Sequence, residues 1–235
     1  MISQKKNILL LHSSNDLYGA SKIFLQLVDL FLSKDFNVHV VLPENGKLDD
    51  FLNQKDIKVS YNELGVLRKK YLNPLGLLNR FIVNIKAIKF LSNYIKIHSI
   101  DLVYTNTSTI LSGGIAAKKN GVSSLFHIHE IPTGNKLYEF FSGKIINNIS
   151  NKVLTVSNSV KNHWVKYINE EKIEKIYNGI VFKKTNSSIE LDEDQDDLVI
   201  TCVARIIPYK GHGYLIDIAN ELIKKSPKFK FLIVG

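Results

Sequence analysis

The sequence predicts an α/β protein whose sheets are doubly wound and mainly parallel. Three observations carry this prediction. Short apolar runs alternate with longer segments of helical spacing through about seven rounds, which is the pattern of parallel strands joined by crossover helices. A polar stretch at 178–197 separates two such patterns. At 235 residues the chain is long enough to bury a substantial core.

The strands of the first domain are predicted from short apolar runs that end at polar or proline positions. The first run stops at His12, and the second is closed by Pro43. The predicted strands are Lys6–Leu11, Val38–Leu42, Ile57–Tyr61, Leu102–Thr105, Ser124–Ile128 and Val153–Val156.

Helices are predicted between these strands, from apolar residues that recur three or four positions apart. The first helix follows the loop Ser13–Gly19, and a long one covers Leu75–Ile97. Leu78, Ile82 and Ile85, with Leu91 and Ile95 further on, should keep roughly one face of the long helix apolar. The other predicted helices are Lys47–Leu52, Ile110–Lys119, Lys136–Asn147 and Asn158–Tyr167.

The domain boundaries follow from composition. Residues 1–180 form the predicted first domain, and 181–197 form a polar linker that ends in an acidic run, Glu190–Asp197, with six acids and no base. Residues 198–235 form one β-α-β pattern. Two strands and one helix cannot cover both faces of a parallel sheet, so this last segment is expected to be the beginning of a second, truncated domain.

Charge and cysteine content narrow the classes of function. The net charge is +9, and without the acidic run it is +15, because 31 basic residues then face 22 − 6 = 16 acidic ones. A basic body suits anionic lipid, nucleic acid or phosphorylated ligands. The single cysteine, Cys202, excludes a disulfide framework. With neither a signal peptide nor a spanning apolar run, we expect a cytoplasmic protein, peripheral at the inner face of a membrane.

A basic turn at Leu198–Gly213 is the first candidate binding site. An apolar strand ends in a turn that carries Arg205 and Lys210, and a helix follows. Ligands collect at the carboxyl ends of parallel strands, and a helix amino terminus favours phosphate. The turn therefore predicts an anion site, although two surface cations on an ordinary turn would look the same.

A second candidate is the segment FHIHEIP, where a predicted strand delivers His127, His129 and Glu130 to its carboxyl end. The two histidines alternate by two and could share one face. A strand-end histidine satisfied by backbone is the alternative. Zinc is a poorer interpretation, because two histidines and one acid lack a convincing further ligand.

These segments resemble, in order, the motifs of the retaining glycosyltransferases of family four. VARIIPYKGHGYLIDIA resembles the turn that opens the family's second domain, with Ala204 where glycine is usual, and DLYGASKIFLQL resembles the loop and first helix. KVLTVSNSVKNHW and KIEKIYNGI resemble two further segments. The resemblance implies a GT-B type fold of two Rossmann-like domains.

The resemblance also implies roles for individual residues. Arg205 and Lys210 would grip the diphosphate of a nucleotide sugar, and the backbone at Gly19 and Ala20 would face the same phosphate. His129 would position the transferred sugar as the catalytic histidine. His127, Glu130 and Asn178 are the secondary candidates, and no residue is identified as a general base.

The activity implied is metal-independent, retaining sugar transfer from a nucleotide sugar to a glycan or lipid-linked acceptor, in surface polysaccharide biosynthesis. The family's pair of glutamates seven residues apart would lie beyond Gly235. We therefore expect this chain alone to be inactive, whether it is a fragment or a natural truncation. An inactive relic or accessory subunit, and a basic binding protein, remain the alternatives.

Two further patterns bear on partners. Arg68, Lys69 and Lys70 precede the long helix and could contact an anionic membrane. Nucleic acid is not expected as a partner, because no zinc pattern, aromatic RNA-binding motif or recognition helix is present. Asp192–Asp194 formally matches a D-x-D metal site, but a crowded acidic run reads more simply as a solvated spacer.

Overall fold

The computed structural model describes residues 5–68, 71, 73–132, 136–180 and 197–235. The chain divides into two compact units, Met1–Ile180 and Val181–Gly235, and each is described by itself. In the part of the chain that the structure describes, no helix is long and apolar enough to cross a membrane.

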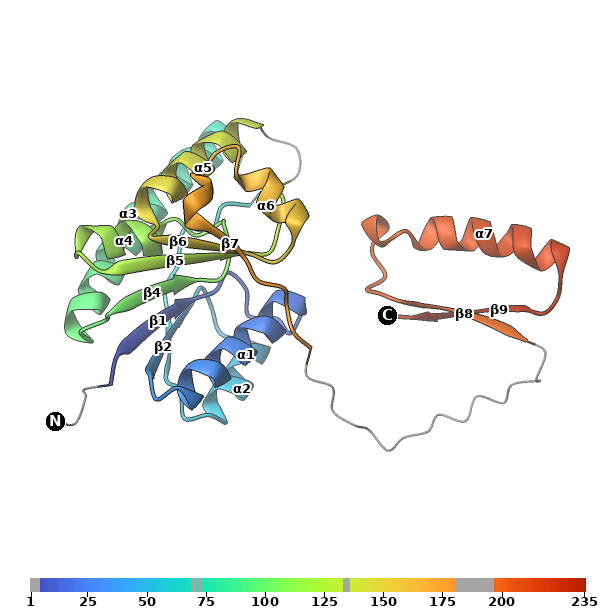
Figure 1. The fold of residues 1–235 in the computed structure, drawn as a ribbon, viewed down its shortest axis with the longest axis horizontal. Coiled ribbons are helices and arrows are strands. Elements are labelled where there is room, and N and C mark those ends of the chain that lie inside the picture. The colour runs from blue at the N-terminus through green and yellow to red at the C-terminus, as the bar shows by residue number, and fades with distance from the viewer. Residues whose placement is uncertain (1–4, 69–70, 72, 133–135, 181–196) are drawn as a thin grey trace. The chain divides into compact units, whose positions relative to one another are not determined.

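The first unit is built on a seven-stranded, entirely parallel sheet (Figure 1). The strand order is β3-β2-β1-β4-β5-β6-β7, so the order reverses between the neighbours β1 and β4. The strands are β1 Asn7–Leu11, β2 Asn37–Leu42, β3 Val59–Tyr61, β4 Leu102–Thr105, β5 Ser123–Ile128, β6 Lys152–Thr155 and β7 Ile173–Lys175.

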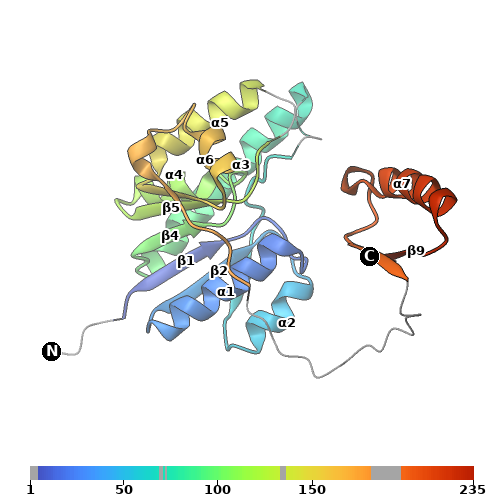
Figure 2. The ribbon, with the colours of Figure 1, turned by 45° about the vertical axis from the view of Figure 1, so that its right-hand side comes forward.

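Helices cover both faces of this sheet, because side chains of each strand alternate between the faces. Ile8 and Leu10 pack toward α1 and α2, while Leu9 and Leu11 pack on the other face, toward α3 and α4. Figures 1 and 2 show the two layers. The helices are α1 Gly19–Ser33, α2 Lys47–Asn53, α3 Pro74–Ile97, α4 Ser112–Lys119, α5 Lys136–Ile149 and α6 Asn158–Trp164.

The predicted doubly wound α/β class is therefore confirmed, and most element bounds are correct to within two residues. β7 was not predicted, because its sequence Ile173-Glu174-Lys175 holds a single apolar residue and so shows no apolar run. The predicted linker 181–197 and its acidic run Glu190–Asp197 lie outside the described residues, except for Asp197.

The predicted apolar face of the long helix was wrong in its first half. The buried residues of α3 are Val83, Ala87, Leu91 and Ile95, spaced by four. Leu78, Ile82 and Ile85 are exposed instead. Helical spacing finds an apolar stripe, but it does not say which of two stripes meets the core.

The second unit is a single parallel β-α-β. β8 Leu198–Val203 and β9 Phe229–Val234 pair directly, and α7 His212–Lys225 crosses between them. A short 3₁₀ turn, Pro208–Lys210, leads into Gly211, whose φ of 78° lies in the left-handed region that favours glycine. The basic turn thus has the strand, turn and helix order expected of it.

Candidate functional site

The candidate site lies where three neighbouring strands of the first unit end. His12 follows β1, Asn106 follows β4, and His129 follows β5. The strand order reverses between β1 and β4, and such a reversal at the carboxyl edge is where open α/β sheets bind ligands. Three chain segments far apart in the sequence are thereby brought to one point.

A continuous chain of hydrogen bonds joins these side chains. The amide nitrogen of Asn106 donates to the carbonyl oxygen of Ala20 at 3.2 Å and contacts His12 Nδ1 at 3.2 Å. Its oxygen lies 2.9 Å from His129 Nε2. Because the Asn106 nitrogen can only donate and its oxygen can only accept, His12 accepts through Nδ1 and His129 donates through Nε2.

The chain continues toward the first helix. With Nδ1 accepting, His12 carries its proton on Nε2, which lies 3.0 Å from Ser21 Oγ. Ser21 Oγ in turn donates to Asp16 Oδ1 at 3.2 Å. His12 also stacks on Phe24, with ring centroids 4.9 Å apart. The network ties the start of α1 to the ends of β1, β4 and β5.

Burial keeps these imidazoles neutral. Burial is the main cause that lowers the pKa of His12 to about 4; His129 lowers it further, while Asp16 acts in the opposite direction. Burial also lowers the pKa of His129, although the neighbouring Glu130 carboxylate partly opposes this. At neutral pH, His129 is therefore a neutral ring with a fixed tautomer.

Glu130 clamps a loop. Its Oε1 accepts from the Ser108 amide at 2.8 Å, from Ser108 Oγ at 2.6 Å and from Thr107 Oγ1 at 2.9 Å, and its Oε2 accepts from the His129 amide at 3.1 Å. With four hydrogen bonds on the carboxylate, Glu130 holds the loop after β4 against the end of β5. This arrangement assigns Glu130 to the support of His129.

His127 lies behind His129, with ring centroids 4.2 Å apart. It is buried, and its Nδ1 lies 2.7 Å from the hydroxyl of Tyr104. Burial, with a smaller contribution from His129, lowers its pKa to about 3. Its Nε2 has no hydrogen-bond partner among the described residues. His127 is therefore a core neighbour of the site and does not reach its surface.

The predicted phosphate-facing backbone at Gly19 and Ala20 forms the first turn of α1. The first amides of a helix have no partner within it, and a Cβ added at Gly19 would meet nothing within 4 Å. The Asp16 carboxylate stands close by, because it accepts a hydrogen bond from the Tyr18 amide at 3.2 Å. Gly19 therefore has open space in which a ligand could approach the backbone. The negative charge of Asp16 weakens the electrostatic attraction of this helix end for an anion.

A cavity of about 670 Å³ opens beside this turn. It is lined by the loops after β1 and β2, and Arg68 enters it and donates to the carbonyl oxygen of Ser13 at 3.4 Å. Arg68 also lines a neighbouring cavity of about 300 Å³ together with Tyr71 and Arg80. The carboxyl edge therefore has room for a ligand beside Asp16 and Arg68. The predicted membrane residues Lys69 and Lys70 lie outside the described residues.

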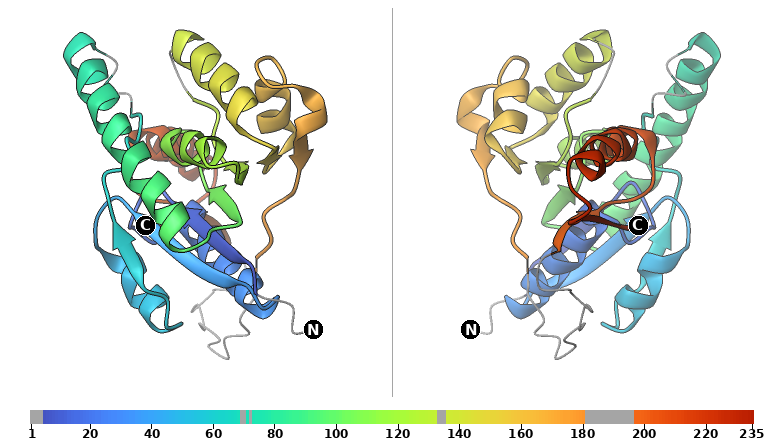
Figure 3. Two further views of the ribbon diagram at one scale, coloured as in Figure 1. Left: turned by 90° about the vertical axis from the view of Figure 1, so that its left-hand side faces the viewer. Right: turned by 90° about the vertical axis from the view of Figure 1, so that its right-hand side faces the viewer.

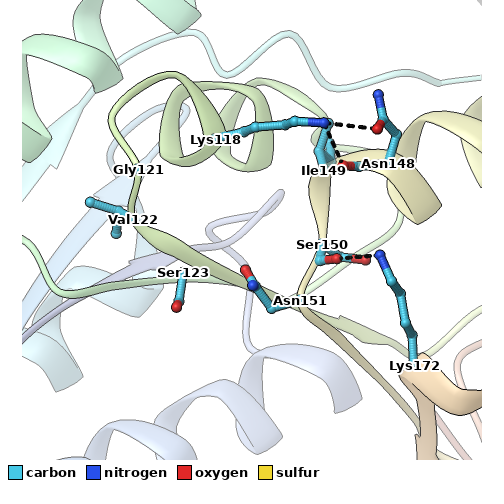
Figure 4. A pocket seen from close by; sticks show the side chains of 9 residues that line it. All are labelled: Lys118, Gly121, Val122, Ser123, Asn148, Ile149, Ser150, Asn151 and Lys172. Carbon is cyan, nitrogen blue, oxygen red and sulfur yellow. Dashed lines mark hydrogen bonds between the residues drawn. The ribbon is translucent and has the colours of Figure 1, made fainter.

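Another cavity, of about 370 Å³, lies between the ends of α4 and α5 (Figure 4). The two lysines that line it donate hydrogen bonds to backbone carbonyl oxygens. Lys118 Nζ donates to Asn148 O at 2.9 Å, and Lys172 Nζ donates to Ser150 O at 2.9 Å. These contacts satisfy carbonyls at the carboxyl end of α5, so the lysines have a structural role here.

The predicted cationic site belongs to the second unit. Arg205 follows β8, and Lys210 ends the 3₁₀ turn before α7; both side chains are exposed. Asn178 is exposed in the first unit, in the segment after β7. Of the predicted residues, the structure thus brings together His127, His129, Glu130, Gly19 and Ala20.

Sequence reasoning missed His12, Ser21 and Asn106 as members of the site. A signal was available, because His12 and Asn106 each stand directly after an apolar strand. The sequence does not reveal that β1, β4 and β5 are neighbours. Among the described residues, no group of three or more His, Cys, Asp or Glu side chains is placed to hold a metal ion.

Comparison with known proteins gives a family and a fold. A family model described as Glycosyltransferase Family 4 matches residues 18–183. The chain is 25% identical over 243 residues to the Escherichia coli UDP-Gal:alpha-D-GlcNAc-diphosphoundecaprenol alpha-1,3-galactosyltransferase, covering 93% of this chain and 59% of that protein.

Two solved structures share the fold. Alr3699/HepE of Anabaena, in complex with UDP and glucose, superposes with a TM-score of 0.72 at 22% identity, over 97% of this chain and 60% of that one. A glycosyltransferase from Rickettsia africae ESF-5 superposes with a TM-score of 0.70 at 19% identity, over 99% of this chain and 69% of that one. The chain spans about three fifths of the length of the Escherichia coli protein and of the Anabaena protein.

Proposed function

The chain belongs to glycosyltransferase family 4, and we propose on that premise that the protein transfers a sugar from a nucleotide-diphosphate sugar to a glycan or lipid-linked acceptor. We further propose retention at the anomeric carbon and a place in the synthesis of a surface polysaccharide, at the cytoplasmic side of a membrane. The observation that carries the proposal is the neutral, tautomer-fixed His129 at the carboxyl edge, where β1, β4 and β5 end.

His129 is proposed to position the sugar. Its Nε2 hydrogen is used by Asn106 at 2.9 Å, so Nδ1 carries the lone pair and can accept a hydrogen bond from a sugar hydroxyl. An uncharged imidazole that accepts a hydrogen bond is suited to an uncharged sugar hydroxyl. The Glu130 clamp on Ser108 and Thr107 supports this ring, because a positioning group must itself be held rigidly.

Arg205 and Lys210 are proposed to bind the diphosphate. In the reaction, the bond between the anomeric carbon and the diphosphate oxygen breaks, and its electron pair leaves with the diphosphate. The acceptor oxygen bonds to that carbon and its proton is released. Two cations beside the departing group stabilise the growing charge, and no metal ion is invoked. The backbone at Gly19 and Ala20, and the exposed Asn178, are proposed as further donor contacts.

The donor is proposed to be a UDP-sugar, because the Escherichia coli relative is named for UDP-Gal and the Anabaena structure contains UDP. The 670 Å³ cavity beside Arg68 is the proposed place for the acceptor. Arg68 and Lys47 line this cavity together with Asp16 and Glu44. In this proposal the two cations contact the anionic part of the acceptor, for example the diphosphate of a lipid-linked sugar.

The test is transfer of labelled sugar from UDP-galactose and UDP-glucose to a lipid-diphosphate acceptor. It uses the protein with any residues that its reading frame adds after Gly235. His129→Ala should lower turnover at least tenfold with little change in UDP affinity. Arg205→Ala and Lys210→Ala should each weaken UDP binding at least fivefold, while Lys225→Ala, an exposed lysine at the other end of α7, should not.

Near-wild-type turnover in all three site variants would remove the site assignment. A wild-type protein that binds UDP-sugars but transfers none, with any acceptor offered, would favour the accessory-subunit alternative instead.

A further inference from the structure

The hydrogen bonds of the candidate site form a chain with a single direction. His129 Nε2 donates to the Asn106 oxygen, and the Asn106 nitrogen donates to His12 Nδ1. His12 Nε2 donates to Ser21 Oγ, which in turn donates to Asp16 Oδ1. Every hydrogen of the chain therefore points away from His129 and toward Asp16.

Two acceptors at the start of α1 fix this direction. The Ala20 carbonyl oxygen accepts from the Asn106 nitrogen at 3.2 Å, which prevents the Asn106 amide from turning round. The Asp16 carboxylate takes the one hydrogen of Ser21 Oγ, so that this oxygen faces His12 as an acceptor. α1 packs on one face of the sheet, opposite α3 and α4 (Figure 3). Residues 16–21, which lead into α1 and open it, thus supply both anchors.

Asp16 is a carboxylate at neutral pH and is not placed to cap the helix. It lies two positions before Tyr18, the N-cap residue of α1. It accepts from the Tyr18 amide at 3.2 Å, from Ser14 Oγ at 2.6 Å and from Ser21 Oγ at 3.2 Å. Partial burial acts to raise the pKa of Asp16, but these hydrogen bonds, with a smaller contribution from His12, hold the pKa below its ordinary value.

The charge of Asp16 acts against donor binding and in favour of the chain. The amides at Gly19 and Ala20 are the proposed contacts of the diphosphate, and a carboxylate beside them repels an anion. At the end of the chain, the same charge attracts each hydrogen in turn and polarises the successive bonds. With its Nε2 hydrogen drawn toward Asn106, His129 becomes a stronger acceptor at Nδ1.

The chain orients its members and does not carry a proton. The Asn106 nitrogen is a donor only and does not accept a proton from its neighbour. Burial, the main cause, lowers the pKa of His12 to about 4, so this ring stays neutral as well. The contribution of the chain to the reaction is therefore the orientation and acceptor strength of His129.

We propose that Asp16 and Ser21 are positioning residues for sugar transfer, which act through His12 and Asn106 to hold His129 as an acceptor for a sugar hydroxyl. This inference rests on the proposed function and deepens it, because it names residues that act on the reaction through His129.

The first measurement separates turnover from UDP affinity in the protein used for the transfer assay. Asp16→Asn keeps the shape and removes the charge, because its oxygen can accept from Ser21 while its nitrogen donates to Ser14 Oγ. Turnover should fall about tenfold, the ratio between hydrogen bonds to charged and to neutral acceptors. UDP affinity should stay equal or increase, since an anion beside the diphosphate is lost. Ser21→Ala should lower turnover by a similar factor, about tenfold, with unchanged UDP affinity.

The matched controls lie further along α1. Asp29→Asn removes a carboxylate that pairs with Lys55 at 2.5 Å. Ser33→Ala removes a hydroxyl that donates to the Leu30 carbonyl oxygen at 2.8 Å. Both variants should keep wild-type turnover and UDP affinity. Thermal unfolding followed by the fluorescence of Trp164, the single tryptophan, shows whether each variant is folded.

The second measurement needs no activity. In protein labelled with ¹⁵N at histidine, NMR should show His12 and His129 each with a hydrogen on Nε2 and none on Nδ1. Asp16→Asn and Ser21→Ala should both shift the Nε2 signal of His129, although Asn106 and His12 lie between Ser21 and that ring.

Three results would overturn the proposal. They are an unchanged His129 signal in both folded variants, wild-type turnover in both, and a loss of turnover matched by an equal loss of UDP affinity. A wild-type protein that transfers no sugar would instead contradict the proposed function. The two failures are distinguishable, because the His129 signal still responds to Asp16 and Ser21 when only the function is wrong.

Discussion

Replacing Glu130 by Gln should lower the free energy of unfolding of the first unit. A loss of turnover in this variant would therefore come at least in part from lost stability. The carboxylate accepts four hydrogen bonds, three on Oε1 from Thr107 and Ser108 and one on Oε2 from the His129 amide. A glutamine keeps the shape. Its oxygen can face only one set of donors, and its nitrogen then meets the N–H groups of the other.

The magnitude follows from these bonds. A hydrogen bond to a charged group contributes about 1.5–3 kcal/mol and a neutral one about 0.5–1.5 kcal/mol. Three bonds weakened by about 1 kcal/mol each, partly relieved by relaxation, and one replaced by a donor facing a donor give a loss of about 3 kcal/mol. For a unit of this size that corresponds to a decrease in Tm of about 6–12 °C.

The assay is thermal and urea unfolding followed by Trp164 fluorescence. Trp164 is suited to this, because its Nε1 donates to the backbone oxygen of Glu130 at 3.3 Å. The control is Glu170→Gln, since Glu170 makes an exposed ion pair with Lys161 at 3.0 Å, and such pairs contribute about 0.5 kcal/mol or less.

An unchanged Tm in Glu130→Gln, equal to that of Glu170→Gln, would refute the clamp. If turnover were nevertheless lost, Glu130 would have to act directly on the substrate.

Three further predictions rest on the same site. Gly19→Ala should leave the Tm unchanged or slightly higher, since an added Cβ meets nothing there. It should weaken UDP-sugar binding if the backbone contacts the donor, and unchanged binding would remove Gly19 from the site. Asn106→Ala should lower turnover about as much as His129→Ala, and the double variant should lose little more; additive losses in these rate measurements would contradict the proposed network. The pKa of His127, about 3, and that of His12, about 4, lie below the ordinary 6.5, so below pH 6.5 the unfolded chain binds more protons, and stability should fall by about 1.4 kcal/mol per pH unit for each ring. Urea unfolding between pH 7.5 and 4.5 should show this slope, and His127→Gln should make it shallower; an equal slope in the variant would show that His127 does not titrate in this way.

Local patterns were sufficient to predict the elements and the fold class. Apolar runs such as 102–105 gave a strand with correct bounds, and the basic turn at Arg205 and Lys210 lies between β8 and α7 as expected. These features depend on the alternation of neighbouring residues, and a sequence displays that directly.

The membership of the site was decided by tertiary structure. The sequence showed His129 and Glu130 at the end of a strand, but the partners of these residues lie 22 and 23 positions away, and His12 lies 94 positions from Asn106. Which strand ends meet depends on strand order, which local periodicity does not contain.

The same division applies to α3. The sequence by itself determined that residues 74–97 form a basic helix with apolar stripes, because side-chain spacing and charge are local properties. Only the packing of α3 on the sheet decided that Val83, Ala87, Leu91 and Ile95 face the core and that Leu78, Ile82 and Ile85 face solvent. Two apolar stripes look alike in sequence, and the free energy of burying one of them in the core selects it.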